Sequence, residues 1–389
     1  NSVSAFGRTG LAPLESLAQA GAFRPTSNSP RAKTIVYLLY LLLLLAFASI
    51  FYSLDRAIAF RAWLTLAEGV GLFFILTKTS VPREKVIYAF LAGMALSAGL
   101  GVYQFLTQTT FASTLLGMAL HDPAALGTSV VQTLSERWLR AYGTLPHPNI
   151  LGGYLVVAIM LLITQCHPDG SRDPDTYLDS CFRRNDRKFF VLQYFLLMLF
   201  TTTLFFTFSR GAWIALALFL ILFRRRKVVC LSLTIVVATF TCLSIIFWQP
   251  FSTRFMGQER LEVRSNQEHV ASLTSVLSII REFPLLGVGI GNAEVALNQK
   301  SLTSWKKWGI EPPHNIFILI LVELGAFGLL LFFLVLLSLL RQYAISYALL
   351  ALVVLGLFDH YLWSLYAGML LFWAMCGLAS SITFKNTAG

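Results

Sequence analysis

The sequence predicts an all-α polytopic membrane protein with about ten transmembrane helices, and three observations support this fold class. Hydrophobic residues make up 56% of the 389-residue chain and charged residues only 13%, which is too apolar for a soluble domain of this size. The apolar residues are gathered in runs long enough to cross a bilayer. Basic residues, among them the block at 224–227, fall between these runs, as is typical of cytoplasmic loops.

The expected spans follow from the apolar runs in order, and some are short enough to need tilt or local thinning of the bilayer. They cover residues 35–52, 57–77, 84–106, 149–165, 189–207, 211–223, 228–248, 315–340, 344–358 and 361–381. If the basic block at 224–227 is cytoplasmic, alternation places both termini inside the cell and most Lys and Arg residues with them. The alternation is self-consistent, which favours ten spans over nine or eleven.

This topology divides the chain into four parts. They are a cytoplasmic N-terminal segment (1–34), seven spans (35–248) with an outer loop at 107–148 and an insertion-like cytoplasmic loop at 166–188, a large outer loop (249–313), and three final spans (314–389). Residue 1 is Asn rather than Met, so one interpretation is a truncated chain that lacks an earlier helix. The loop at 166–188 has no apolar periodicity, and we assign it no function.

The large outer loop is expected to contain an amphipathic helix that lies over the membrane face. Val270, Leu273, Leu277 and Ile280 recur at helical spacing, and Pro284 ends the run. The glycines that follow, at 287, 289 and 291, could be mistaken for a dinucleotide loop, but no strand precedes them. They are better explained by tight turns after the helix.

Charge and cysteine content exclude several classes of function. The net charge of +11 is explained by loop topology, so nucleic-acid binding is not predicted. The five cysteines have no metal-type spacing, and neither a disulfide framework nor a metal site nor a cofactor is expected.

Two polar clusters at the outer ends of spans are the main candidates for chemistry. Arg210 begins a span after a short turn, where helix N-terminal amides and a guanidinium suit a phosphate, although an interfacial arginine that reaches lipid headgroups would look the same. His314 follows Pro312 and Pro313 at the start of another span and could act as a base, although a capping role is the commoner one.

Other polar residues on the spans have both a functional and a structural interpretation. Asp359 and His360 form an outer turn that could orient a base or could be an ordinary polar turn. His147 lies between two prolines. Its first interpretation is a rigid helix entry, and its second is a contribution to an acceptor groove. Glu68 lies near mid-membrane with Arg61 on nearly the same face, which suggests either a functional carboxylate or a structural pair.

At these residues the chain resembles the O-antigen ligase-like superfamily, which includes O-antigen ligases, O-antigen polymerases and related oligosaccharide transferases. The resemblance spans roughly Tyr142 to Leu378 and rests on five segments in order. They are HPNILGGY from His147, SRGAW from Ser209, PLLGVGIGN from Pro284, HNIFILILVELGAFG from His314 and DHYLWSLYAGMLLFW from Asp359.

The resemblance implies a metal-independent membrane glycosyltransferase of the bacterial inner membrane, with its active site facing the periplasm. The donor would be a glycan linked to undecaprenyl pyrophosphate, and the acceptor would be lipid A core or another glycan. Arg210 would bind the pyrophosphate, and His314 would deprotonate the acceptor hydroxyl or assist the leaving group. Asn315, His147 and His360 would contribute to substrate binding.

One position departs from the pattern of the superfamily. Members commonly place an arginine about fifteen residues before the proline of the PLLGVG-like segment, where this chain has His269. Arg264 or Arg260 would replace it if the helix is shifted. The sequence leaves open a ligase, a polymerase, a transporter of lipid-linked glycans and a catalytically inactive relic.

Overall fold

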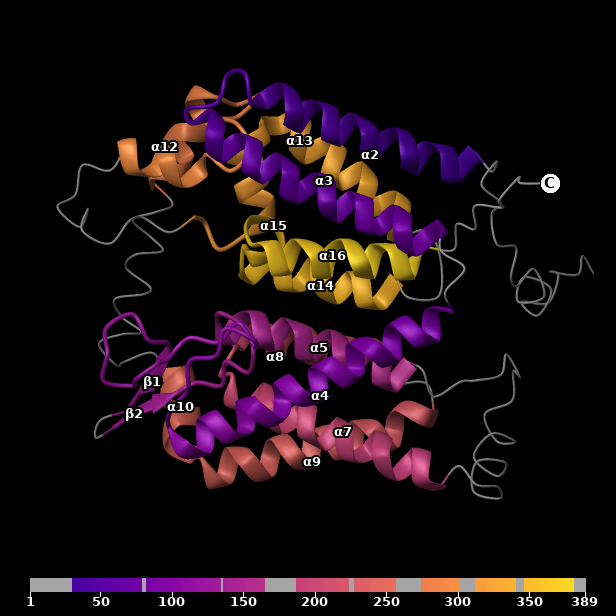
Figure 1. Cartoon of the computed structure of the whole chain (residues 1–389), viewed down its shortest axis with the longest axis vertical. Coiled ribbons are helices and arrows are strands. Elements are labelled where there is room, and N and C mark those ends of the chain that lie inside the picture. Colours follow the sequence, from indigo (N-terminus) through magenta and orange to yellow (C-terminus); the bar gives the residue numbers. More distant parts are fainter. Residues whose placement is uncertain are drawn as a thin grey trace, which may run out of the picture.

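The computed structural model is mostly helical, and the part of the chain that it describes contains one small two-stranded sheet. It describes residues 30–78, 82–133, 136–164, 187–223, 227–256, 274–300, 312–340 and 346–380. The long helices lie side by side and alternate in direction, so their connections gather at two opposite ends of the molecule (Figure 1). This alternation is the one that the apolar runs predict.

The helices that correspond to the predicted spans begin and end close to the expected residues. They are α2 (Pro30–Ser49), α3 (Arg56–Lys78), α4 (Arg83–Thr107), α5 (Pro148–Thr164), α7 (Arg187–Phe206), α8 (Arg210–Phe223), α9 (Lys227–Ile246), α13 (Ile316–Leu340) and α14 (Ser346–Phe358). The last predicted span is instead two helices, α15 (Tyr361–Ser364) and α16 (Tyr366–Ala379), because Leu365 between them is extended, with φ −109° and ψ 138°.

Three of these helices, α3, α4 and α13, are long and apolar enough to cross a membrane. A fourth candidate joins α9 to α10 (Trp248–Met256), which meet at an angle of 100°. The remaining apolar helices are shorter: α2, α5, α7, α8, α14 and α16. The protein is thus a mostly helical membrane protein, and its described residues contain three or four candidate spans and several short apolar helices.

The two predicted outer loops lie at the same end of the molecule (Figure 1). The first contains β1 (Val130–Gln132), which pairs antiparallel with β2 (Arg137–Leu139). The second contains α10, which packs against β1, and α12 (Ala293–Lys300). The loop at 166–188 and the N-terminal segment fall largely outside the described residues.

The C-terminal part of the predicted amphipathic helix is present at residues 274–282. Its buried side chains are Val276 and Ile279, whereas Leu277 is 51% exposed. The position of this helix over the membrane face stays a prediction. Val270 and Leu273 lie outside the described residues.

The glycine-rich loop after this helix docks into a break in α13. Gly325 has φ 64° and ψ −167°, so α13 kinks there and its neighbouring peptide groups lose their helical partners. The loop supplies new partners: Val288 N donates to Val322 O at 2.9 Å, and Ala326 N donates to Pro284 O at 2.9 Å. The helix break and the loop thus satisfy one another's backbone hydrogen bonds.

Candidate functional site

The turn between α7 and α8 presents Arg210 at the end of the bundle where the two predicted outer loops lie (Figure 1). Phe208 in this turn has a left-handed backbone, with φ 47°, although it is not glycine. Its fully buried ring packs against Phe205 and Trp213, with ring centroids 5.5 Å and 6.1 Å away. Burial of the ring holds the backbone in this conformation, so α8 begins at Arg210 with its side chain exposed.

A second arginine packs against the same turn. Arg254 of α10 donates from Nε and Nη2 to the carbonyl oxygen of Phe208, at 3.2 Å and 3.1 Å. Arg210 Nη1 in turn donates to the carbonyl oxygen of Arg254 at 3.3 Å. Two guanidinium groups and the free amides of a helix start are therefore gathered at one place, which is the composition of an anion site.

The start of α8 lies in contact with the turn that carries Asp359. A Cβ atom placed on Gly211 would lie 2.9 Å from the Cβ atom of Phe358. Gly211 follows Arg210, and Phe358 precedes Asp359. The absence of a side chain at Gly211 thus lets the basic helix start and the acidic turn come together.

His314 is held at the start of α13 by its neighbour Asn315. The Asn315 Oδ1 atom accepts hydrogen bonds from the amides of Phe317 and Ile318, at 2.9 Å and 3.1 Å, and so caps the helix. Its Nδ2 atom donates to the carbonyl oxygen of Leu357 at 3.3 Å, which ties the helix start to the end of α14. Asn315 therefore places His314 beside the Asp359 turn.

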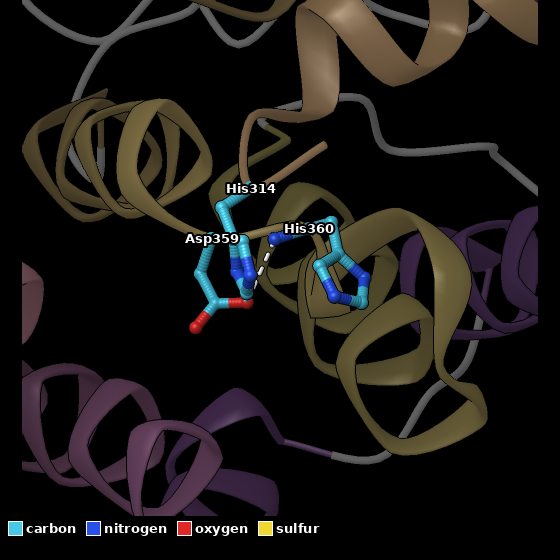
Figure 2. Close-up of side chains that lie close together, drawn as sticks. All are labelled: His314, Asp359 and His360. Atoms are coloured by element: carbon cyan, nitrogen blue, oxygen red, sulfur yellow. Dashed lines mark hydrogen bonds and ion pairs between the residues drawn. The ribbon is translucent and has the colours of Figure 1, made fainter. Parts of the chain in front are cut away.

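His314, Asp359 and His360 form one cluster in which the imidazole of His314 faces the carboxylate (Figure 2). His314 Nδ1 lies 4.0 Å from Asp359 Oδ1, and the side chains are 29% and 14% exposed. The two imidazole rings are 5.2 Å apart between centroids. His360 Nδ1 is 2.6 Å from Ser364 Oγ, which fixes that ring. The sequence left open whether this turn orients a base or is an ordinary polar turn, and the structure places the imidazole of His314 within ion-pair distance of Asp359.

Hydrogen bonds orient the Asp359 carboxylate. Its Oδ1 atom accepts the amide hydrogen of His360 at 2.8 Å. Its Oδ2 atom accepts a hydrogen bond from Nδ2 of Asn149, at the start of α5, also at 2.8 Å. The carboxylate is therefore held by two donors while one oxygen faces His314.

The same three residues could be considered as ligands of a metal ion. Their nearest ligand atoms lie within 4.8 Å of one another. Two ligands of a tetrahedral zinc ion at bond lengths of about 2.1 Å are about 3.4 Å apart, so the side chains would have to close in to hold an ion. The geometry fits an imidazole supported by a carboxylate better than a preformed metal centre.

His147 lies at the start of α5 and takes part in the capping of that helix. Its Nδ1 atom accepts the amide hydrogen of Asn149 at 3.1 Å, and its carbonyl oxygen accepts from Ile150 and Leu151. This bears out the structural interpretation of His147 as a rigid helix entry, and it places His147 two residues from Asn149, the partner of Asp359.

A comparison with protein families identifies the central part of the chain. Residues 195–333 match the family model described as O-antigen ligase. This segment of the chain is therefore similar to the O-antigen ligase family. The matched segment includes both Arg210 and His314, and it ends before the Asp359 turn. A search of curated proteins found no match.

The matched segment contains a second arginine, Arg254, that the sequence analysis does not single out. The pattern of the superfamily places its second arginine by distance from Pro284, and this distance leads to Arg260, Arg264 and His269 instead. Those three residues lie outside the described part of the chain. The signal that could have found Arg254 is a single basic residue in the last turn of a short helix, WQPFSTRFM, that directly follows an apolar run.

Two carboxylates on the candidate spans have different surroundings. Glu323 is buried and accepts a hydrogen bond from Trp363 Nε1 at 2.9 Å and further bonds from the backbone amides of Gly291 and Ala293. It therefore ties α13 to the docked loop and to α15. Glu68 is an exposed side chain on α3.

Proposed function

We propose that this protein is a membrane glycosyltransferase that moves a glycan from undecaprenyl pyrophosphate to an acceptor hydroxyl, acting as an O-antigen ligase. The observation that carries the proposal is that two helix starts within the matched segment both contact the end of α14. One start bears Arg210 and packs against Phe358, and the other bears His314, which lies beside Asp359. An anion site next to a base is what a transfer from a pyrophosphate requires.

The proposed topology has ten spans, with the site at the periplasmic face of the bacterial inner membrane. It counts the short helices as spans beside α3, α4 and α13. A 14-residue helix such as α8 rises about 21 Å, less than the roughly 30 Å hydrocarbon core, so the bilayer would thin around the site. Thinning would bring the headgroup region, and with it a lipid-linked pyrophosphate, to the start of α8.

Arg210 and Arg254 are proposed to bind the pyrophosphate of the donor. The diphosphate carries the negative charge that leaves with the lipid, so cations placed on it stabilise the leaving group as the bond to the sugar breaks. Arg254 supplies the second guanidinium that His269 could not. This weakens the alternative of an inactive relic in so far as it rested on His269; its other ground, the insertion-like loop at 166–188, lies largely outside the described residues.

His314 is proposed to act as the general base. The acceptor oxygen attacks the anomeric carbon of the donor sugar while its proton passes to the imidazole. The bond between that carbon and the pyrophosphate oxygen breaks, and undecaprenyl pyrophosphate leaves with the electron pair. The carboxylate of Asp359, 4.0 Å away, stabilises the imidazolium that forms. His360, Asn315 and His147 lie at the same end of the bundle. They are proposed to act on the substrate indirectly, by holding the neighbouring residues in place.

The transporter alternative depended on Glu68 as a mid-membrane carboxylate on a solute pathway. Glu68 and Arg61 are both exposed on α3 rather than enclosed by neighbouring helices. The hydrogen bonds described above instead join the starts of α5 and α13 to the turn after α14, and the figure shows that these segments lie at one end of the bundle (Figure 1). A pathway through the bundle would require the reverse distribution.

The test is glycan transfer by the purified full chain in nanodiscs, with a lipid-linked oligosaccharide as donor and lipid A core as acceptor. Arg210→Ala and His314→Ala are each expected to lower the rate by about 100-fold or more, since each removes a charge or a base needed in the transition state. Arg56→Ala and His121→Ala are matched controls, because Arg56 and His121 lie at the same end outside the cluster.

The products decide between related reactions. Capped lipid A core supports the ligase, whereas glycan chains that lengthen on the lipid carrier would assign the chain to the polymerases. Movement of the donor across the vesicle bilayer without any covalent product would refute the transferase. Normal transfer by Arg210→Ala or His314→Ala would remove that residue from the mechanism.

A further inference from the structure

Arg140 is a charged residue that is almost completely buried, at 5% exposure, between the first outer loop and the start of α5. Its guanidinium donates three hydrogen bonds to three different segments. Nε donates to the carbonyl oxygen of Thr207 at 2.6 Å, and Nη1 donates to Ser129 Oγ at 2.9 Å. Nη2 donates to Asn149 Oδ1 at 2.6 Å. A buried guanidinium is expensive unless its donors are used, and these acceptors use them.

Two of these acceptors lead to the two halves of the proposed active site. Thr207 belongs to the α7–α8 turn, three residues before Arg210. Asn149 passes the contact on, because its Nδ2 atom donates to Asp359 Oδ2, and Asp359 faces His314. The guanidinium of Arg140 therefore holds both the turn that carries Arg210 and the asparagine that orients Asp359 beside His314.

The backbone around Arg140 is itself held firmly. Ala141 N donates to the carbonyl oxygen of Phe206 at 2.9 Å, so the loop is bonded to the end of α7 next to Thr207. The buried side chain of Gln104 in α4 accepts from the amides of Tyr142 and Gly143 at 3.0 Å and 2.8 Å. Arg140 thus starts from a fixed position, which is what a residue that orients others requires.

The amide of Asn149 is suited to its place between the two ionic groups. Its oxygen can only accept, and it faces the guanidinium. Its nitrogen can only donate, and it faces the carboxylate. This order fixes the orientation of the amide and polarises the chain from Arg140 to Asp359.

We propose that Arg140 is a positioning residue for the transfer reaction, which acts through Asn149 on Asp359 and His314 and through Thr207 on the turn of Arg210. The proposal rests on the proposed function, and it assigns Arg140 no contact with substrate. Loss of the guanidinium would let the carboxylate and the turn move relative to one another, and misplacement by about 1 Å can reduce a rate by about 100-fold.

The first experiment compares Arg140→Gln with Arg137→Gln in the transfer assay. Arg137 lies on β2 of the same loop and donates to the carbonyl oxygen of Ala124, away from the site, so it is a charge-matched control. Arg140→Gln is expected to lower kcat by about 10- to 100-fold with KM changed by less than about threefold. Equal kcat values for the two variants would overturn the proposal. If Arg140→Gln does not fold, Arg140→Lys takes its place. Lysine keeps the positive charge but lacks the planar guanidinium that donates to three acceptors at once, so kcat is expected to fall by less than in Arg140→Gln.

A double-mutant cycle tests whether Arg140 acts through Asn149. Asn149→Ala should lower kcat by a similar factor, and the double variant should be no slower than the slower single variant, because the contact is already broken. Losses that multiply would show that Arg140 and Asn149 act independently and would overturn the proposal.

A measurement that needs no activity separates this proposal from the proposed function. The rate at which diethylpyrocarbonate modifies His314, read by mass spectrometry, should rise several-fold in Arg140→Gln because Asp359 is no longer held beside the ring. It should stay unchanged in Arg137→Gln. An unchanged rate in both would overturn the positioning role. A rise in a protein that transfers no glycan would support the positioning of His314 while refuting the transferase.

Discussion

Replacement of Gly325 by alanine should destabilise the protein through the junction between α13 and the glycine-rich loop. With φ 64° and ψ −167°, Gly325 occupies a backbone region that is almost closed to other residues. An added Cβ atom would lie 2.2 Å from the carbonyl carbon and oxygen of Leu285. Both are backbone atoms, so no side-chain rotation relieves the overlap, and the loop must move away.

The expected loss can be assembled from two terms. The strained backbone conformation costs about 1–3 kcal/mol in a residue with a side chain. Retreat of the loop breaks the bonds from Ala326 N to Pro284 O and from Phe327 N to Leu285 O, at 2.9 Å and 3.3 Å. Each such bond contributes about 0.5–1.5 kcal/mol. The sum is about 2–6 kcal/mol.

The assay is the thermal unfolding of purified protein in one detergent, followed by tryptophan fluorescence. Gly71→Ala in α3 is the matched control, because a Cβ atom there meets nothing within 4 Å. The control should melt at or slightly above the parent temperature, since alanine favours a helix over glycine by about 1 kcal/mol. If Gly325→Ala has the same melting temperature as the Gly71→Ala control, the docked loop does not depend on the break in α13 and the reasoning fails.

Three further predictions concern the outer end of the molecule. Arg254→Gln should raise KM for the lipid-linked donor by about tenfold, measured by donor titration, since it removes a charged partner of the pyrophosphate. EDTA should leave transfer unchanged, whereas zinc at concentrations that draw His314, Asp359 and His360 together should inhibit it, measured as initial rates. Burial lowers the pKa of His121 below its usual 6.5, so below that pH the unfolded state takes up more protons and the loop should become easier to cleave by protease. His121→Phe should remove this pH dependence.

The helices and their alternation could be predicted from sequence because each lies in an apolar run bounded by polar or basic residues. The starts of α5, α8 and α13 were predicted within a residue or two, since proline, serine and asparagine mark helix starts. The break at Leu365 had no such marker, because an extended leucine within an apolar run looks like the interior of a helix.

The site was predictable in its residue types and only partly in its contacts. The sequence placed Arg210 and His314 at one face by topology and noted Asp359 as a residue that could orient a base. It could not show that Asp359 pairs with His314, or that Asn149 holds the carboxylate, because these contacts join segments far apart in the sequence. Arg140 escaped for the same reason, since a lone arginine in an outer loop resembles any solvated charge until its burial is known.

Glycines set the distance between the two halves of this site. The helices α5 and α8 meet the segment from α14 to α16 at Gly153 and Gly211. A Cβ atom on Gly153 would overlap the hydroxyl group of Tyr361, at 1.8 Å, and one on Gly211 would overlap Phe358. A larger residue at either position would separate the helix that begins at Arg210 from the turn that bears Asp359. The proposed chemistry needs cation and base at a fixed separation, so the packing of these two glycines is as much a condition of function as the charged groups themselves.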